Sequence, residues 1–388
     1  LSVASGSKSR QLGVRIMINY QQDRMGVAEG IALVFVVTFK SVFLSEPVRS
    51  IINGAGLAWL IVFLHGMVLL GLLLLMLQVF KHYPGCDLLE VAERILGKWG
   101  AWLVGIYYVC LFVFNSALNL RQFAENTLLT ALPQIEFKVI AFWYGVAAAV
   151  LVYFGVESLA RALYTILPFI VSAVIIVLLL LRPFYQIYFL APWLGTGIGQ
   201  VISFSLKVVG IDLPAVLLLV LATRFPNLAV VKNAAIFGLT ISTVLKSLST
   251  LVFCMVFGTA VGQEKVLPFY EMARLVYLSR YLQRVEALFI ILWVIVGLGC
   301  IAVTSYLGTY LLARLLRLPD LKPLIPIMAM ISIELASWPP DIISVIELDE
   351  KLIETYATWG AYGVPAIFIA AYWFKQRQRK GGKAWVGG

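Results

Sequence analysis

The chain has 388 residues, of which 61% are hydrophobic and 13% are charged, and its formal net charge is +10. Soluble domains are on average roughly half apolar and a quarter charged, so this composition excludes a soluble globular protein and indicates a membrane protein. The two histidines and four cysteines show neither the recurring spacing of zinc ligands nor a disulfide framework, so no metal and no cofactor is expected.

The N-terminal stretch is polar and basic, and it lacks the apolar core of a signal peptide. We therefore predict a cytoplasmic N-terminal segment over 1–26, a single transmembrane domain over 27–374 and a basic cytoplasmic tail over 375–388. A basic tail is suited to anionic lipid head groups. The lipid bilayer therefore explains the positive charge, and no nucleic-acid partner is expected.

Apolar runs long enough to cross a hydrocarbon core of about 30 Å recur along the whole domain. They predict an all-α polytopic membrane protein with about ten transmembrane helices. The predicted spans are 27–52, 56–80, 99–121, 137–155, 158–181, 199–222, 231–259, 286–311, 322–338 and 358–374. Segments on the side of the two termini hold roughly twice as many Lys and Arg residues as segments on the other side, which predicts that both termini are cytoplasmic.

Two connecting segments are predicted to be amphipathic helices. Asp87 and Glu90 form a capping-box pattern, apolar residues follow at helical spacing, and Gly97 ends the pattern. This helix is expected on the cytoplasmic surface. The segment 267–285 alternates apolar residues with arginines at helical spacing and is expected to pack over the outer face.

The first and sixth spans are interrupted at matching positions. Pro47 follows Lys40 by seven residues, and Pro214 follows Lys207 by seven residues. Proline removes a backbone donor and clashes with the preceding turn, and Gly210 weakens the second segment further, so both spans should be kinked or unwound. Unwound backbone at membrane depth persists only where it is buried in protein or lines a wet cavity. The two breaks therefore predict an internal site.

Ten spans divide into two sets of five that cross the bilayer in opposite directions, which predicts a five-plus-five inverted repeat with discontinuous helices 1 and 6. Lys40 and Asp212 each lie thirteen residues into their spans, so each is roughly 20 Å deep and near the bilayer centre. A charge there costs about 2.5 to 3.5 kcal/mol, so we predict that the two approach each other. Two interpretations stay open: a ligand site that receives the carboxylate and ammonium of an amino acid, and a structural ion pair.

Other charged residues in or near the spans are given structural interpretations. Lys207 is expected to snorkel or to pair with Asp212, Lys246 to face a packed interior, and Glu334 to lie near the outer end of its span. The chain has no hydrolase, kinase or P-loop motif, so no enzymatic activity is expected.

Several strings are similar to those of one known family. They are Pro84-Gly85 with Glu90, Leu96-Gly97-Lys98, Leu120-Arg121-Gln122-Phe123, the stretch from Tyr153 to Arg161, and Arg284-Val285-Glu286 with Leu292-Trp293. Together they resemble the B subunit of spore germinant receptors over residues 27 to 380. The resemblance implies membership of the amino acid/polyamine/organocation superfamily and its five-plus-five inverted-repeat fold, in agreement with the topology above.

The resemblance also implies a nutrient-sensing subunit, whose ligand is a small-molecule germinant such as an amino acid. Such subunits trigger germination with A and C partner subunits in the inner membrane of the endospore. The implied pocket lies around spans 1, 3, 6 and 8 and comprises Phe39, Lys40, Ser41, Tyr108, Ser205, Gly210, Asp212 and Trp293. Relatives carry small residues where helix 1 unwinds, whereas Phe39 and Lys40 stand there in this chain. A long cation at that point could fill the cavity or select an anionic ligand.

Two other functions are compatible with the sequence. One is a cation- or proton-coupled amino acid transporter, in which Lys40 or Lys207 would take the place of sodium. The other is a subunit of a ligand-gated ion channel with a polar pore at a subunit interface. A receptor needs only a ligand whose affinity differs between two conformations, whereas a transporter also needs an alternating-access cycle.

Overall fold

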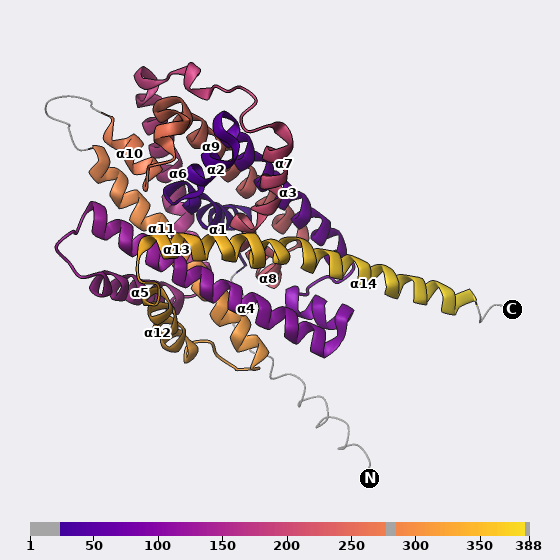
Figure 1. Cartoon of the computed structure of the whole chain (residues 1–388). Coiled ribbons are helices and arrows are strands. Elements are labelled where there is room, and N and C mark those ends of the chain that lie inside the picture. Colours follow the sequence, from indigo (N-terminus) through magenta and orange to yellow (C-terminus); the bar gives the residue numbers. More distant parts are fainter. Residues whose placement is uncertain (1–23, 277–284, 385–388) are drawn as a thin grey trace, which may run out of the picture.

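The computed structural model describes residues 24–276 and 285–384, and all regular elements within these ranges are helices. In chain order they are α1 (Val27–Phe39), η2 (Lys40–Phe43), α2 (Glu46–Gly54), η3 (Ala55–Leu57), α3 (Ala58–Phe80), α4 (Leu88–Thr130), α5 (Phe137–Tyr153), α6 (Val156–Leu180), η4 (Arg182–Phe184), η5 (Ile187–Leu190), α7 (Ile198–Lys207), η6 (Val209–Val216), α8 (Leu217–Val220), η7 (Ala222–Arg224), α9 (Leu228–Gly262), α10 (Pro268–Arg274), α11 (Val285–Leu315), α12 (Leu324–Ser337), α13 (Ile342–Lys351), η8 (Leu352–Ala357) and α14 (Thr358–Ala384). Figure 1 shows them gathered in one bundle, from which α14 projects towards the C-terminus.

The two predicted helix breaks are confirmed. The first span consists of α1, a single 3-10 turn over Lys40–Phe43, and α2, which begins at Glu46 with Pro47 in its first turn. The sixth span consists of α7, the 3-10 segment Val209–Val216 that contains Pro214, and the short α8. In each span the α-helix ends several residues before the proline, at Phe39 and at Lys207, and Pro47 and Pro214 lie within the segments that follow. Both breaks are buried, as irregular backbone in a membrane must be.

The contacts between helices repeat between the two halves of the chain. α1 packs against α9 and α6, and correspondingly η6 of the sixth span packs against α3 and α14. α4 packs against α12, and α11 packs against α5. The pairs α3 with α9, α4 with α11 and α5 with α12 join equivalent spans directly. This reciprocal pattern is that of an inverted repeat.

The number of membrane crossings can be compared with the lengths and the hydropathy of the helices. In the described residues, six helical stretches are long and apolar enough to cross a membrane, and a seventh crossing results if α12 and the α13–α14 helix, bent by 114°, are taken together. The bent pair covers two of the predicted spans, 322–338 and 358–374. The predicted spans that these stretches do not represent are 27–52, which begins with α1, and 137–155, which contains the 17-residue α5. The total of ten therefore stays a prediction.

The predicted amphipathic helix after Asp87 is confirmed as a separate segment at the start of α4. The Asp87 side chain accepts a hydrogen bond from the Glu90 backbone at 2.9 Å, and the Glu90 side chain accepts one from the Asp87 backbone at 3.2 Å. Gly97 has φ +80°, which breaks the helix before the membrane span begins. Arg314, at the end of α11, lies 3.0 Å from Asp87 and 2.9 Å from Glu90. The surface helix is therefore tied to the end of α11.

Asp87 should make stability depend on pH. Burial raises the pKa of this carboxyl from 3.8 to about 6, although Arg314 favours its charged form. The pKa of Asp87 is higher in the folded state than in the unfolded state, so its contribution to the free energy of unfolding is largest below about pH 4. That contribution is lost as the pH rises through about 6, which lowers the free energy of unfolding by about 3 kcal/mol. Asp87→Asn keeps a capping side chain but removes the titration. We expect its thermal midpoint to change less between pH 4 and 7 than that of the wild type. Identical pH profiles would contradict this, and Glu93→Gln, an exposed neighbour, is the control.

Parts of three predictions lie outside the described residues. The segment 1–26 is described only from residue 24, and the predicted outer helix is described over α10, which buries Phe269 and Met272, but not over 277–284. The α14 helix continues to Ala384, through most of the predicted tail 375–388. Lys375 donates a hydrogen bond to the Arg94 carbonyl oxygen at 2.6 Å. The domain boundaries themselves stay predictions.

Candidate functional site

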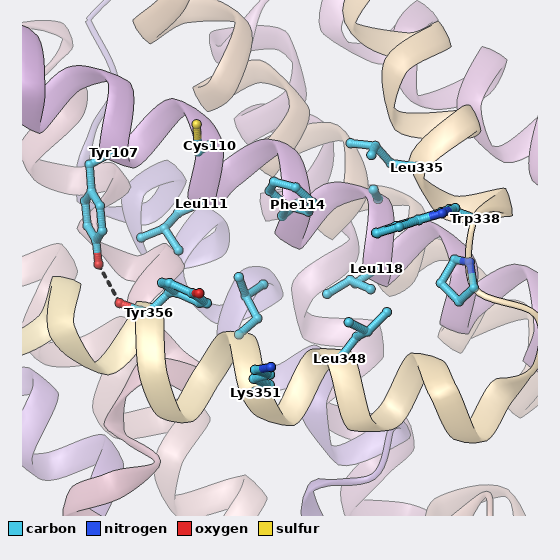
Figure 2. A pocket seen from close by; sticks show the side chains of 13 residues that line it. Tyr107, Cys110, Leu111, Phe114, Leu118, Leu335, Trp338, Leu348, Lys351 and Tyr356 are labelled. Atoms are coloured by element: carbon cyan, nitrogen blue, oxygen red, sulfur yellow. Dashed lines mark hydrogen bonds between the residues drawn. The ribbon is translucent and has the colours of Figure 1, made fainter.

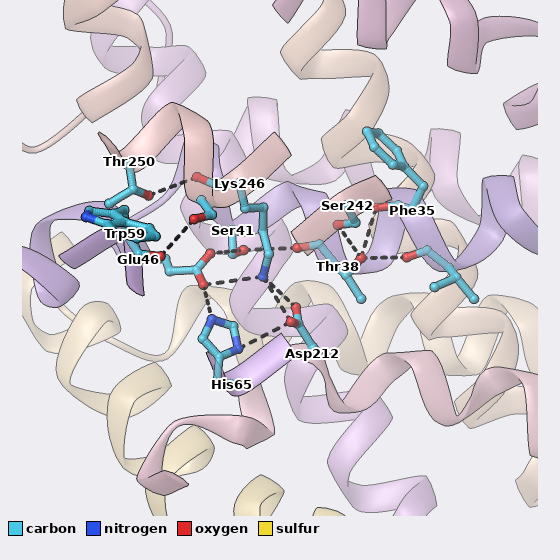
Figure 3. A network of polar contacts seen from close by, with 12 residues as sticks. Phe35, Thr38, Ser41, Glu46, Trp59, His65, Asp212, Ser242, Lys246 and Thr250 are labelled. Atoms are coloured by element: carbon cyan, nitrogen blue, oxygen red, sulfur yellow. Dashed lines mark hydrogen bonds and ion pairs between the residues drawn. The ribbon is translucent and has the colours of Figure 1, made fainter. Parts of the chain in front are cut away.

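A buried ionic network joins the two broken spans. Lys246 of α9 lies 2.8 Å and 3.0 Å from the two carboxylate oxygens of Asp212 in η6, and 3.3 Å from Glu46 Oε1 at the start of α2. His65 of α3 lies between the same carboxylates, with Nε2 2.7 Å from Glu46 and Nδ1 3.3 Å from Asp212. Figure 3 shows these side chains converging from four different spans. We call Glu46, His65, Asp212 and Lys246 the ionic network.

The network is sealed from solvent and close to electrically balanced. His65, Asp212 and Lys246 are fully buried, and Glu46 is 5% exposed. The Ser41 hydroxyl donates to the Glu46 carboxylate and also lies 3.0 Å from the Thr38 carbonyl oxygen. Two carboxylates face one ammonium, so a protonated imidazole would bring the net charge to zero. The His65 Nδ1 contact to Asp212 is within ion-pair distance but lacks hydrogen-bond alignment.

The predicted contact between Lys40 and Asp212 is wrong. Asp212 is held by Lys246 and His65, whereas the Lys40 ammonium donates to Asn119 Oδ1 of α4 at 2.6 Å. Depth along two spans indicates which residues share a level of the membrane, but it says nothing about how each broken segment is rotated. The prediction that Lys246 faces a packed interior identified its burial and missed its partners.

The other predicted pocket residues contact several different helices and do not converge on one another. The Gly210 backbone N–H donates to Thr358 Oγ1 at 3.3 Å, and the Tyr108 hydroxyl donates to the Gly360 carbonyl oxygen at 3.4 Å, so both face α14. Ser205 donates to the Val201 carbonyl oxygen of its own helix at 2.7 Å. Phe39 stacks on Phe35 with ring centroids 4.7 Å apart, and Trp293 lies beside Phe123 at 6.1 Å. Ligand contact by these residues stays a prediction.

Sequence reasoning missed three members of the ionic network as functional residues. Glu46 lies in the predicted break between Lys40 and Pro47 but is assigned no role from the sequence, and His65 is one of the two histidines that are considered there only as zinc ligands. Lys246 is expected only to face a packed interior. All three are ionisable side chains inside apolar spans. Because placing such a side chain in a membrane is unfavourable, its presence there indicates a functional role by default. Read together, the charges in spans 1, 2, 6 and 7 could have indicated a network.

A separate cavity lies between α4, the end of α12 and the α13–η8 segment. Its volume is about 340 Å³, and its lining is mainly apolar. It is lined by Tyr107, Cys110, Leu111, Phe114, Ala117, Leu118, Leu335, Trp338, Pro339, Leu348, Lys351, Leu352 and Tyr356. In Figure 2, side chains of α4 face those of α13 and η8 across this space. No member of the ionic network is among these thirteen residues, so the cavity and the network are distinct features.

The family described as "Spore germination protein" matches residues 25–343. Spore germination protein KB of Bacillus subtilis (strain 168) is 24% identical over 255 residues, which are 64% of this chain and 68% of that protein. Spore germination protein YndE of the same organism is 25% identical over 147 residues, which are 37% of this chain and 40% of that protein.

Solved structures with a similar backbone are membrane transporters. A mutant of the Eremococcus coleocola manganese transporter superposes with a TM-score of 0.56 at 13% identity, covering 96% of this chain and 79% of that one. The same transporter in complex with an aromatic bis-isothiourea substituted compound gives 0.57 at 14% identity, covering 95% and 79%. At such identity the likeness shows the fold alone. The chain therefore has the fold of these transporters, and it belongs to the spore germination protein family.

Proposed function

We propose that this protein is the nutrient-sensing membrane subunit of a spore germinant receptor and that its germinant is an amino acid. It would act with A and C partner subunits in the inner membrane of the endospore, with both termini in the cytoplasm. The family match supports a role in germination. The observation that carries the sensing role is the ionic network, because it joins both broken spans through a fixed internal cation.

A fixed cation favours sensing over ion-coupled transport. Coupling by a mobile cation needs carboxylates that are free to bind it and release it. Here Glu46 and Asp212 are both already paired with Lys246, a cation that is part of the chain. The network therefore stabilises the junction of the broken spans without any ion from outside. A ligand that binds nearby need only favour one arrangement of these spans over another.

The outer halves of the broken spans are held by contacts that such a ligand could bias. Arg49 of α2 lies 2.5 Å from Glu354 of η8 and 3.6 Å from Glu350 of α13. The Thr358 hydroxyl donates to the Lys207 carbonyl oxygen of α7 at 2.7 Å. Span 1 is thus attached to the helical segment directly before the last span, and span 6 is attached to the start of the last span. Loss of these few contacts would let α2 and α7 move relative to α13, as expected of a switching element.

A proton-coupled amino acid transporter is the second candidate. The transporter fold and the position of His65 between two carboxylates favour it, since an imidazole can change protonation state near neutral pH. In that case the network would be the coupling site, and substrate would accumulate when a proton gradient is applied.

Lys40 is the residue by which ligand binding is best tested. Its ammonium is buried at the first break and is hydrogen-bonded to a neutral amide, so we expect it to bind the ligand's carboxylate. Lys40→Met, measured in lipid nanodiscs against the twenty common L-amino acids, should weaken binding about 10- to 100-fold, the usual value of a hydrogen bond to a charged group. Lys207→Met, an exposed lysine at the second break, is the matched control. Equal affinities for wild type and Lys40→Met would contradict the assignment.

A further inference from the structure

The cavity of about 340 Å³ between α4 and the α13–η8 segment is open to the surface of the helical bundle. Several of its lining side chains are large, apolar and exposed, among them Trp338 at 74% and Tyr356 at 52%. Exposed apolar surface of this kind in a membrane protein faces either lipid or a partner chain. We call this open cavity the groove, and its occupant is the question.

The groove lies in the half of the membrane that is remote from Lys98. Lys98 and the exposed Trp99 begin the third span directly after the break at Gly97. Tyr107 and Leu118, at the two ends of the α4 wall, follow Lys98 by nine and twenty residues, which places them roughly 14 Å and 30 Å along the helix. The hydrocarbon core is about 30 Å thick. The groove therefore runs from near the bilayer centre to the far boundary, which is the outer one in the predicted orientation.

Lys351 lies towards the far boundary on the opposite wall of the groove. The Tyr107 hydroxyl donates to the Tyr356 carbonyl oxygen, so these two residues share one level. Figure 2 shows Leu118 and Leu348 near each other at the other end, with Lys351 between the two levels. Because Lys351 precedes Tyr356 by five residues, it is about 7 Å nearer to the far boundary. From there a lysine can extend its ammonium to the head groups while its stem stays on apolar surface.

Lys351 gives the groove a positive charge that has no counter-ion in the chain. It is the one charged side chain in the lining, which contains no carboxylate. Glu350 and Glu354, close to it in sequence, pair with Arg49 of α2 instead. No ion pair within 4 Å joins Lys351 to these residues or to Glu347 in the part of the chain that the structure describes. A cation beside an apolar groove at this depth suits an anion with a long hydrophobic body.

We propose that the groove binds an anionic phospholipid of the surrounding bilayer. One alkyl chain lies along α4 from Leu118 towards Tyr107, and the phosphate accepts a hydrogen bond from the Lys351 ammonium. This is the direction that a lipid has in its own leaflet, with the head group at the boundary and the chain towards the bilayer centre. Trp338, exposed at the outer end of the groove, is of the residue type that favours the level of the head groups.

The wall that carries the lipid also contacts the first broken span. The segment Leu352–Ala357 is a π-helix, a rare conformation that is frequent at functional sites. Its residues Leu352 and Tyr356 line the groove, whereas Glu354, outside the lining, pairs with Arg49 of α2. A lipid between α4 and this segment would therefore stabilise the arrangement in which the segment holds α2.

Cys110 provides a direct probe of the groove. It lines the groove and is exposed, whereas Cys86, Cys254 and Cys300 are buried. The rate at which N-ethylmaleimide modifies Cys110 is measured by mass spectrometry on the full chain in maltoside micelles. Palmitoyl-oleoyl phosphatidylglycerol is titrated against zwitterionic phosphatidylcholine with the same chains. We expect phosphatidylglycerol to slow the modification at a concentration about 10-fold or more lower, the usual value of a hydrogen bond between charged groups.

Three variants separate the head group from the chain. Lys351→Met should raise the concentration of phosphatidylglycerol that is needed to that of phosphatidylcholine, and leave the latter unchanged. Lys138→Met removes an exposed lysine at the start of α5, on the same predicted side of the membrane, and should match the wild type. Leu348→Trp fills the groove from an exposed lining position and should weaken both lipids equally. The thermal midpoint confirms that each variant folds, and the comparison of the two lipids on wild type needs no variant.

Four results would overturn the proposal. Equal protection of Cys110 by the two lipids on wild type, or an unchanged preference in Lys351→Met, would exclude recognition of the head group by Lys351. Protection by oleate at a lower concentration than phosphatidylglycerol would make the occupant a free fatty acid. If no lipid slows the modification, the groove is not a lipid site and is left for a partner protein. The assay contains no germinant, so its result is independent of the proposed sensing function.

Discussion

Replacing Lys246 with methionine is expected to destabilise the protein by about 3 to 5 kcal/mol, because two buried carboxylates would then lack their shared cation. Glu46 and Asp212 are both within 3.3 Å of the Lys246 ammonium and have no solvent to compensate its loss. The thermal midpoint of the purified variant in detergent would measure the change. The same substitution should also loosen the junction of the two broken spans, which can be followed by proteolysis.

The matched control removes the charges together. The triple variant Glu46→Gln, Asp212→Asn, Lys246→Met leaves no unpaired charge, and neutral replacement of a whole buried ionic group is often close to neutral in stability. We therefore expect the triple variant to be clearly more stable than Lys246→Met alone. A triple variant that is no more stable than the single one would show that the network is not held by its charges.

Replacing Gly210 with alanine is expected to disturb the contact between the sixth and the last span. A Cβ at this position would lie 2.7 Å from the Ala357 Cβ, the Ile353 carbonyl oxygen and the Thr358 backbone nitrogen. Two of these are backbone atoms, which cannot rotate away, so η6 and η8 must separate. Overpacking of this kind typically costs about 1 to 3 kcal/mol.

Gly71→Ala is the control for that substitution. Gly71 lies within α3, and a Cβ there would meet no atom within 4 Å, so alanine should be neutral or slightly stabilising in a helix. The measurement is the thermal midpoint together with the affinities for the twenty common L-amino acids. If Gly210→Ala matches Gly71→Ala in both, the close approach of spans 6 and 10 has no energetic consequence. A loss of affinity with little loss of stability would indicate that the contact belongs to the ligand-bound arrangement.

The fold was largely predictable because its determinants are local. The length of an apolar run predicts a span, Pro47 and Pro214 mark the two broken segments, and Gly97 separates the surface helix from the third span. These features act within a few residues of themselves, so the sequence alone reveals them. The segment before the last span was missed, since α13 and η8 are less apolar than a span and their helical character depends on packing against α4 and η6.

The site was less predictable because it depends on rotation and on long-range partners. Lys40 and Asp212 both lie at the breaks that the sequence predicts, yet each binds a residue from another span, Asn119 and Lys246 respectively. Sequence position gives no information on which face of a broken helix turns inward.

One experiment tests the sensing function most directly. The purified chain is reconstituted in liposomes, and a tritiated mixture of the twenty common L-amino acids is supplied with and without an inward proton gradient or sodium gradient. We predict saturable binding that is weakened by Lys40→Met, with no accumulation of amino acid inside the vesicles under any gradient. Concentrative uptake by this chain alone would contradict the receptor function and establish transport.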